Sequence, residues 1–227
     1  HIAFINTPPR FLWGLETSTL HKVPRIIRNI INPLLKHWRE KDRDYAKKAD
    51  LVIANSINIK SRIEDFYGVE SEVIYPQLID KDYKSTTREI DGEYYLIINR
   101  LVKYKKIDKI IELFNTLNKK LIIVGDGSEI TNLKKLATGN IQFTGFISEE
   151  EKYNYLDNAK ALIYPGEEDF GIGMVEALAH GKPILAFNGG GAREIINEDC
   201  GILFDSYDVF SLQKKIIDLE NRNFDKN

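Results

Sequence analysis

The sequence predicts an α/β protein whose larger part is a doubly wound parallel sheet. Six short apolar runs alternate with amphipathic helical patterns between residues 94 and 219, which is the pattern of successive βαβ units. Several of these runs end in glycine-bearing turns that lead into a helix, and ligands of open parallel sheets bind at such turns. The composition, 43% hydrophobic and 29% charged, is that of an ordinary globular chain.

The first part of the chain predicts a shorter α/β unit. Residues 2–5 are expected to form a short buried strand that ends at two prolines. Residues 51–56 and 72–75 are expected to form two more strands. Ser56 is a helix N-cap, and Gly68 ends the helix that follows.

Residues 22–48 are rich in Lys and Arg, with apolar residues at near-helical spacing and a break expected near Pro33. One interpretation is a pair of amphipathic helices with a solvated basic face. The other is a surface for an anionic membrane or a lipid-linked acceptor. The apolar residues that define the spacing are Ile26, Ile27, Ile30, Ile31, Leu34 and Leu35.

From residue 77 to residue 91 the apolar periodicity lapses, which indicates an interdomain linker or a long surface loop. We therefore expect two domains, residues 1–80 and residues 81–227. The strands of the second are expected at residues 94–99, 121–124, 141–144, 161–164, 184–187 and 201–204. Its helices are expected at residues 107–117, 129–137, 149–158, 172–180, 192–196 and 208–219.

Charge and composition exclude some classes of protein. With 34 acidic and 32 basic residues, a general nucleic-acid binder is disfavoured. The single cysteine, Cys200, fits a reducing compartment, and no apolar run approaches the length of a membrane span. We expect a cytoplasmic protein, with peripheral membrane contact as the alternative. The chain opens at His1 and its only methionine is Met174, so we also expect a fragment whose early part is missing.

The stretch from residue 161 to residue 183 organises the predicted site. An apolar strand runs into an acidic, glycine-bearing turn, and a helix begins near Gly171. The unpaired amides of a helix's first turn favour an anion. Glu168 and Glu176 lie eight residues apart around that point, and carboxylates accept hydrogen bonds from hydroxyls. A nucleotide sugar offers both a diphosphate and hydroxyl groups.

This stretch resembles the E-x7-E signature of retaining glycosyltransferases with the GT-B fold, of the family 4-like kind. The resemblance implies that Glu176 holds the ribose of the donor and that Glu168 contacts the transferred sugar. It also implies donor contacts from the backbone of Phe170, Gly171, Ile172 and Gly173. The implied fold is a Rossmann-like donor domain, residues 81–227, after the C-terminal part of a second, acceptor domain, residues 1–80.

The turn after the first strand of the second domain carries Arg100 and Lys105 at the expected mouth of the sheet. Two cations there would stabilise a departing diphosphate, although a cationic cluster is also typical of a solvated face. The turn resembles the family's R-L-V-x-x-K element, which binds the donor's phosphates. Its Tyr-Lys form is most similar to bacterial mannosyltransferases of polysaccharide and O-antigen synthesis.

Three further turns resemble donor-binding elements of the family. Gly125 and Gly127 lie in a V-G-x-G turn, which could equally be a tight strand-to-helix connection. Phe146 and Ile147 match the position that holds the base, with core packing of Phe146 as the alternative. The third turn contains Gly189, Gly190 and Gly191, and Glu194 ends the same element.

Two positions depart from the family pattern. Related mannosyltransferases have His-Thr-Pro where this chain has Asn6, so an imidazole is absent, and Asn6 is the candidate for a hydrogen bond on the acceptor side. Met174 replaces a proline at the start of the helix, which should make that start looser. No cluster of His, Cys and carboxylates suggests a metal.

The resemblance therefore predicts transfer of a hexose, with mannose from GDP-mannose as the preferred donor, to a saccharide or lipid-linked saccharide with retention of configuration. A UDP-sugar is the alternative donor, and no cofactor is expected. Three other functions remain open: hydrolysis of glycosides by Glu168 and Glu176, epimerisation of a nucleotide sugar, and non-catalytic binding of a nucleotide sugar.

Overall fold

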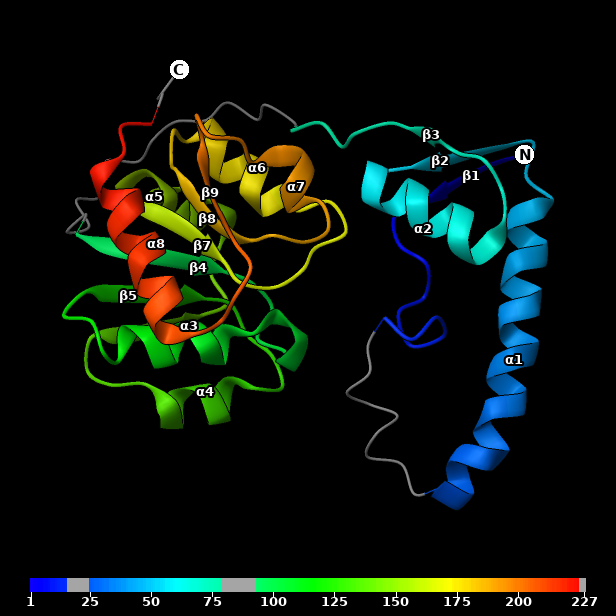
Figure 1. Cartoon of the computed structure of the whole chain (residues 1–227), viewed down its shortest axis with the longest axis horizontal. Coiled ribbons are helices and arrows are strands. Elements are labelled where there is room, and N and C mark those ends of the chain that lie inside the picture. The colour runs from blue at the N-terminus through cyan, green and yellow to red at the C-terminus, as the bar shows by residue number, and fades with distance from the viewer. Residues whose placement is uncertain (16–24, 79–92, 225–227) are drawn as a thin grey trace. The chain divides into compact units, whose positions relative to one another are not determined.

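The computed structural model describes residues 1–15, 25–78 and 93–224, with the backbone alone described at 25–30. The chain divides into two compact units, His1–Gln77 and Leu78–Asn227. Each unit has its own parallel sheet with helices packed on it (Figure 1). The segment expected to be a linker lies mostly outside the described residues.

The first unit contains a three-stranded parallel sheet in the order β1-β2-β3. The strands are β1 (Ile2–Ile5), β2 (Leu51–Ala54) and β3 (Glu72–Val73). Its helices are α1 (Arg25–Lys47) and α2 (Ile57–Tyr67). As predicted, the Ser56 side chain caps α2, and Gly68 ends it with a φ of 66°.

The break expected near Pro33 is wrong, because α1 continues through that residue. A proline inside a helix removes one backbone donor and crowds the carbonyl four residues earlier, so its cost is confined to about one turn. The following turns of α1 are fixed by tertiary contacts. Arg39 Nε donates to the carbonyl oxygen of Leu12 at 2.6 Å, and Ala46 is buried in the core of this unit.

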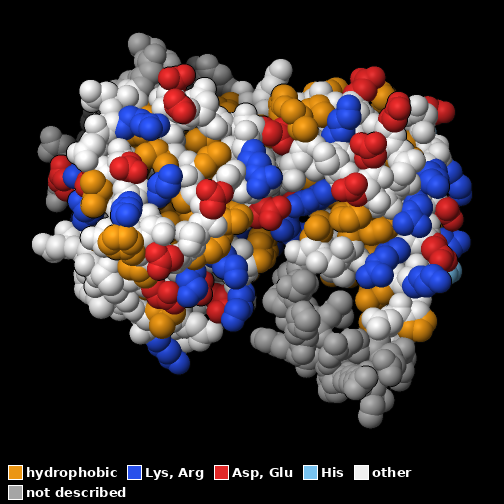
Figure 2. Space-filling model, in the orientation of Figure 1, with side chains coloured by type: hydrophobic (Ala, Val, Ile, Leu, Met, Phe, Trp, Pro, Cys, Tyr) orange, Lys and Arg blue, Asp and Glu red, His pale blue; other side chains and the backbone are white. Residues whose placement is uncertain are grey.

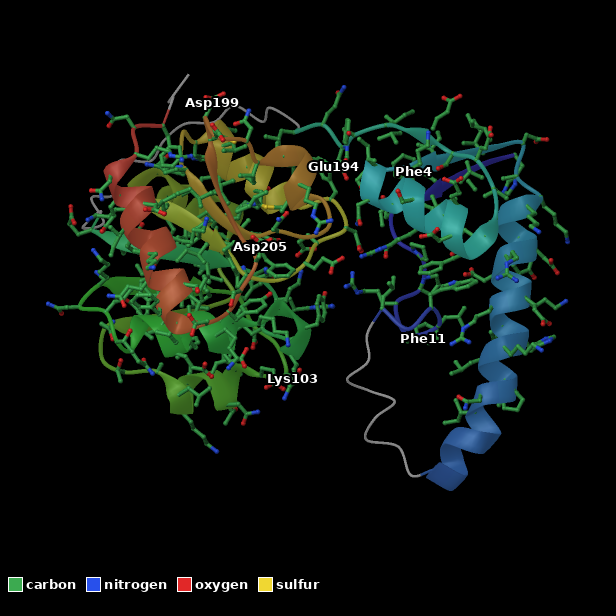
Figure 3. The ribbon with its side chains drawn as sticks, viewed as in Figure 1. Phe4, Phe11, Lys103, Glu194, Asp199 and Asp205 are labelled. Carbon is green, nitrogen blue, oxygen red and sulfur yellow. The ribbon has the colours of Figure 1, made fainter. Side chains whose placement is uncertain are left out.

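The expectation that residues 2–5 form a buried strand is also wrong. Ile2 and Phe4 are 64% and 52% exposed, whereas Ala3 and Ile5, which alternate with them, pack against the core (Figure 3). The residues in that core come from α1, α2 and the same face of β1 and β2. The helices thus cover one face of this sheet, and the side chains of Ile2 and Phe4 belong to the other.

The second unit contains a six-stranded parallel sheet in the order β6-β5-β4-β7-β8-β9. Its strand order reverses at β4, between the crossovers to β5 and to β7, which is the arrangement expected for a doubly wound sheet. The strands are β4 (Tyr94–Ile98), β5 (Lys120–Val124), β6 (Ile141–Gly145), β7 (Ala161–Tyr164), β8 (Ile184–Phe187) and β9 (Gly201–Phe204).

Helices cover both faces of this sheet, and each predicted helix is present (Figure 1). On one face, Tyr95 and Ile97 of β4 pack against α3, α4 and α8. On the other, Tyr94 and Leu96 pack against α5, α6 and α7. The helices are α3 (Ile107–Phe114), α4 (Ile130–Leu136), α5 (Glu149–Asn158), α6 (Ile172–Ala179), α7 (Ala192–Ile195) and α8 (Val209–Asn221).

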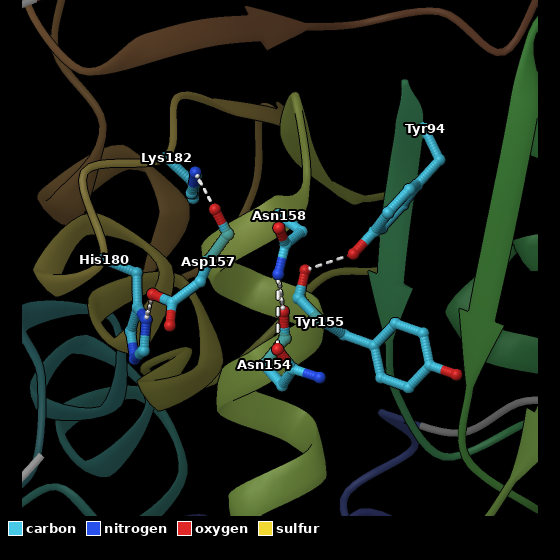
Figure 4. Close-up of polar contacts among 7 residues, drawn as sticks. All are labelled: Tyr94, Asn154, Tyr155, Asp157, Asn158, His180 and Lys182. Carbon is cyan, nitrogen blue, oxygen red and sulfur yellow. Dashed lines mark hydrogen bonds and ion pairs between the residues drawn. The ribbon is translucent and has the colours of Figure 1, made fainter. Parts of the chain in front are cut away.

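Polar contacts fix the ends of α5 and α6 that lie beside the amino ends of the strands (Figure 4). The Tyr94 hydroxyl donates to the carbonyl oxygen of Tyr155 at 2.8 Å. His180 Nδ1 lies 2.8 Å from Asp157 Oδ1, and Lys182 Nζ donates to the Asp157 carbonyl oxygen at 2.6 Å. These contacts belong to the edge of the sheet opposite the predicted site.

Candidate functional site

The turns that carry the predicted site residues meet at the carboxyl edge of the six-stranded sheet. Backbone hydrogen bonds join them: Leu101 N donates to Asp126 O at 2.9 Å, and Gly125 N donates to Gly145 O at 2.9 Å. Glu168 and Gly190 form a short β-bridge on the other side of β4. Parallel strands bring their carboxyl ends to one edge, so turns far apart in the sequence become neighbours.

Close backbone packing explains the glycines of two of these turns. A Cβ on Gly125, whose φ is +127°, would lie 2.0 Å from the Asn99 carbonyl oxygen. A Cβ on Gly190, with a φ of +56°, would lie 1.9 Å from the Glu168 carbonyl oxygen. Gly127 and Gly191 are similarly crowded by backbone carbonyl oxygens. These glycines are therefore required for turn-to-turn packing, and that packing positions the turn of Glu168.

Lys105 and Glu168 form a buried ion pair at the centre of the site. Lys105 belongs to a single turn of 3-10 helix, η2 (Lys103–Lys105), and its side chain is only 4% exposed. Its ammonium pairs with Oε1 of Glu168 and lies 4.9 Å from the ring centroid of Tyr104. Lys103, two residues earlier, is exposed instead (Figure 3).

Arg100 and Lys105 both follow β4 at the carboxyl edge of the sheet, but they differ in burial. Arg100 is exposed, whereas Lys105 turns inward, because Lys103–Lys105 is a 3-10 turn that ends at Lys106 in the left-handed conformation. The chain thus separates an exposed cation from a buried one. The buried cation neutralises Glu168, the first carboxylate of the sequence signature.

Tyr164, at the end of β7, is a site residue that the sequence did not reveal. Its hydroxyl donates to Glu168 Oε1 at 2.9 Å, the same oxygen that pairs with Lys105. Burial raises the pKa of Tyr164, Tyr104 and Glu176 raise it further, and the nearby Asn99 side chain lowers it by less than these raise it. The hydroxyl therefore keeps its proton, and remains a hydrogen-bond donor, at neutral pH.

Glu176, the second carboxylate, lies on α6 and is paired with a lysine of α5. Lys152 Nζ lies 2.9 Å from Glu176 Oε1, and about one fifth of the Glu176 side chain is exposed. Sequence reasoning missed Lys152, because it lies inside a helix rather than in a turn. Each signature carboxylate thus pairs with a lysine, Glu168 with Lys105 and Glu176 with Lys152.

The amino end of α6 lies between the two carboxylates in the sequence. Gly171 is the N-cap, with a φ of 102°, and no side chain caps the first turn. Met174 is fully buried, and its Cε occupies the place where a Cβ on Gly171 would lie, 2.1 Å away. Phe170 is buried, while Ile172 is 48% exposed. Because the N-cap is a glycine, no N-cap side chain covers the amide groups at the start of the helix.

A hollow of about 600 Å³ lies beside Arg100, between the turns that follow β4, β5 and β6. Phe146 lies at its edge and is 88% exposed, so the alternative of core packing for Phe146 is wrong. Ile147 is half-buried against the core of α5 and α6. The rest of the lining is formed by Ile98, Asn99, Val124, Gly125, Asp126, Ser148, Glu149 and Lys152.

Asn99, in the lining of this hollow, has an unsatisfied amide group. Its Oδ1 accepts from Arg100 N at 2.9 Å, but its buried Nδ2 has no hydrogen bond to the residues that the structure describes. Buried donors without a partner are rare in native proteins. This amide is a second feature of the site that sequence reasoning missed.

Three other predicted site residues are Asn6, Gly189 and Glu194. Asn6 is exposed at the end of β1 in the first unit. Gly189 lies near Phe187 and Glu167, and Glu194 lies on α7 and is half-buried (Figure 3). Within residues 1–15, 25–78 and 93–224, no three His, Cys, Asp or Glu side chains gather where they could hold a metal ion. Over the same residues, none of the helices is long and apolar enough to cross a bilayer.

Comparison with known proteins gives a family match and several relatives. The family model described as "Glycosyl transferases group 1" matches residues 79–227. An uncharacterized glycosyltransferase of Methanocaldococcus jannaschii is 26% identical over 171 residues, which cover 72% of this chain and 45% of that protein. A GDP-mannose-dependent monoacylated alpha-(1-6)-phosphatidylinositol monomannoside mannosyltransferase of Corynebacterium glutamicum is 30% identical over 137 residues, covering 53% of this chain and 36% of that protein.

A solved structure shows the same fold. The Anabaena protein HepE, in complex with UDP and glucose, superimposes with a TM-score of 0.70 at 22% identity, over 82% of this chain and 59% of HepE. Together with the two parallel sheets, this likeness confirms the expected α/β fold of the GT-B class. The chain spans less than half the length of the two curated relatives.

Proposed function

The chain belongs to the glycosyl transferases group 1 family, and from this premise we propose that it transfers a hexose from a nucleotide diphosphate sugar to a saccharide acceptor. The observation that carries the proposal is the convergence of Arg100, Lys105, Glu168 and Glu176 on one edge of a six-stranded parallel sheet. These residues come from two turns and one helix, next to a hollow of about 600 Å³.

In this proposal the donor lies along the carboxyl edge of the sheet. The base occupies the hollow beside Phe146 and Ile147, where an exposed aromatic ring and apolar walls suit a flat heterocycle. The ribose hydroxyls donate to Glu176 on α6. The diphosphate lies between Arg100 and the uncapped start of α6, because cations and free amides both favour that charge.

The transferred sugar contacts Glu168, and Lys105 acts at the same place. As the bond between the sugar and the phosphate breaks, negative charge develops on the diphosphate. Arg100 at the surface and Lys105 beneath it stabilise that charge in a partly desolvated site. The anomeric configuration is retained in this account, and the leaving phosphate accepts the proton of the acceptor hydroxyl. No side-chain nucleophile is required.

Mannose from GDP-mannose is our preferred donor, with a UDP-sugar as the alternative. The preference is supported by the mannosyltransferase among the relatives and by the Tyr-Lys form of the turn at residues 104–105. The alternative is supported by the likeness to HepE, which was solved with UDP. Residues 81–227 would form the donor domain, and residues 1–80 would contribute Asn6 to the acceptor side.

We extend the proposal to a lipid-linked acceptor at an anionic membrane surface. On α1, Leu34, Trp38 and Tyr45 are exposed, and Lys41 is exposed on the same face of the helix. In Figure 2, side chains of Lys and Arg and of Asp and Glu both occur over the region of α1. Exposed apolar and aromatic residues with lysines suit the interface of anionic lipids. Co-sedimentation with phosphatidylglycerol vesicles, reduced in Trp38→Ser and absent with phosphatidylcholine, is the expected result.

Nucleotide-sugar turnover tests the proposed reaction. The protein is incubated with GDP-mannose or UDP-glucose and mannose-terminated oligosaccharides, and release of the nucleoside diphosphate is measured together with the anomeric configuration of the product. We expect GDP release that depends on acceptor, and an α-linked product from the α-linked donor. Inversion of configuration, or consumption of the donor without transfer to the acceptor, would contradict this mechanism.

A further inference from the structure

The hydrogen bond from Tyr164 to Glu168 makes the two oxygens of the carboxylate unequal. Oε1 receives both protein donors, the Tyr164 hydroxyl at 2.9 Å and the Lys105 ammonium. Oε2 is the oxygen farther from the Lys105 ammonium, and the Tyr164 hydroxyl contacts Oε1. One fifth of the Glu168 side chain is exposed, so a ligand can reach it. The contacts with Tyr164 and Lys105 thus concentrate on one oxygen of the carboxylate, and Oε2 is the oxygen better placed to meet a ligand.

The ring of Tyr164 is fixed on several sides. Tyr164 is the last residue of β7 and is buried. A Cβ on Gly173, in the first turn of α6, would lie 3.5 Å from its Cε2, which is ordinary contact distance. The Lys105 ammonium lies 5.9 Å from the ring centroid. A ring held by a strand, a helix and a buried cation presents its hydroxyl in one direction, so it is a rigid reference point for Glu168.

Glu168 needs such a reference point, because it lies on an irregular turn rather than on a helix or strand. A glutamate side chain has several rotatable bonds, and holding it in one geometry costs conformational entropy. Lys105 alone does not determine rotation about the last bond of the side chain, since an ammonium pairs with either oxygen. A hydroxyl at fixed distance selects one oxygen and turns the other toward solvent.

We propose that Tyr164 is a positioning residue for the donor sugar, which orients Glu168 so that Oε2 accepts a hydrogen bond from a hydroxyl of the sugar to be transferred. This inference rests on the proposed function, because it requires a nucleotide sugar at the site. Tyr164 itself acts through Glu168. Its hydroxyl therefore matters for ligands that carry the sugar and is without effect on the nucleotide alone.

The test is the affinity of wild type and Tyr164→Phe for GDP-mannose and for GDP, measured by calorimetry on the full 227-residue chain. In Tyr164→Phe, we expect the affinity for GDP-mannose to fall about 3- to 10-fold, the effect of one lost hydrogen bond, and the affinity for GDP to stay within about twofold. If the chain prefers uridine nucleotides, the same comparison is made with UDP-glucose and UDP.

Tyr94→Phe is the matched control, because it also removes one buried tyrosine hydroxyl with a hydrogen bond, 2.8 Å to the Tyr155 carbonyl oxygen, at the opposite edge of the same sheet. Both variants should lose similar thermal stability, but Tyr94→Phe should bind both ligands as wild type does. In a Glu168→Gln background, Tyr164→Phe should reduce GDP-mannose affinity no further, since the two side chains act as one unit.

Equal losses of affinity for GDP and GDP-mannose in Tyr164→Phe would overturn the inference and assign Tyr164 a purely structural role. Unchanged affinity for both would overturn it as well. In either case wild-type binding of the nucleotide sugar would leave the proposed function in place. Failure of the wild-type chain to bind any nucleotide or nucleotide sugar would overturn the proposed function and this inference together.

Discussion

Lys152 Nζ lies 2.9 Å from Oε1 of Glu176, so a lysine of α5 holds the carboxylate to which we assign the ribose. Lys152 also lines the hollow to which we assign the base. It therefore connects the two halves of the proposed nucleoside site. Lys105 pairs with Glu168 in a similar way, so each of the two signature carboxylates is held by a lysine.

Replacing Lys152 by Met should weaken binding of a nucleoside diphosphate about tenfold. The substitution leaves a half-buried Glu176 without its cation and free to rotate, so the ribose loses an oriented acceptor. Calorimetry with GDP measures the effect. Lys109→Met is the control, because it removes a surface pair with Glu112 on α3 and should bind as wild type does. Equal affinity in Lys152→Met would show that the Lys152–Glu176 pair has no part in nucleotide binding.

Arg100→Ala and Lys105→Met should differ in stability although both weaken nucleotide binding. Arg100 is exposed, so its removal should change the free energy of unfolding by less than about 0.5 kcal/mol. Lys105→Met leaves a largely buried Glu168 unpaired and should cost about 3 kcal/mol. Thermal unfolding distinguishes the two variants, because the melting temperature changes by ~2–4 °C per kcal/mol for a chain of this size. Equal melting temperatures would contradict the buried ion pair.

Gly190→Ala should destabilise the protein by at least about 2 kcal/mol and should also weaken nucleotide binding. The added Cβ would lie 1.9 Å from the Glu168 carbonyl oxygen, in a backbone conformation that alanine rarely adopts. The turn of Glu168 must then move. Gly139→Ala is the control, since nothing lies within 4 Å of its Cβ and its φ is not in the left-handed region. A neutral Gly190→Ala would contradict the packing of the two turns.

The protein should lose stability at alkaline pH. Burial raises the pKa of five tyrosines, namely Tyr67, Tyr94, Tyr95, Tyr164 and Tyr207, above the ordinary value of about 10. The folded state holds these protons more tightly than the unfolded chain does. Their contribution to stability is therefore fully present below pH ~10 and is lost as the pH rises above it. Urea unfolding at pH 8 and pH 11, with phenolate absorbance in parallel, measures this. A midpoint that does not fall at pH 11 would contradict the prediction.

Much of the fold could be predicted because each element of the second unit carries a local signal. The alternation of apolar runs and amphipathic patterns reports strands and helices directly, and Ser56 and Gly68 mark the ends of α2 through their own backbone chemistry. The predictions were wrong where tertiary packing determines the burial of a residue or the length of a helix. The exposure of Ile2 and Phe4 depends on which sheet face the helices cover, and the continuity of α1 through Pro33 depends on contacts further along the helix.

The site was predictable as a set of turns but not as a set of contacts. The positions of Glu168 and Glu176 follow from strand ends and helix starts. The partners Tyr164 and Lys152 do not, because they become neighbours only through the order of strands and the packing of α5 on α6. The burial of the Lys105 side chain likewise depends on the 3-10 helix after β4, and the neighbouring residues in the sequence do not predict that helix.

The proposed donor site at the carboxyl edge of the six-stranded sheet requires binding of a nucleoside diphosphate, and calorimetry of the chain with GDP, UDP, ADP and NAD measures this directly. We predict that GDP binds, that UDP is the only other nucleotide to compete, and that Glu176→Ala and Arg100→Ala each weaken binding about tenfold or more. A ligand at a hundredfold excess over its Kd also stabilises by about 2.7 kcal/mol, which thermal unfolding would register. Binding of neither GDP nor UDP, or binding that both variants leave unchanged, would contradict the claim.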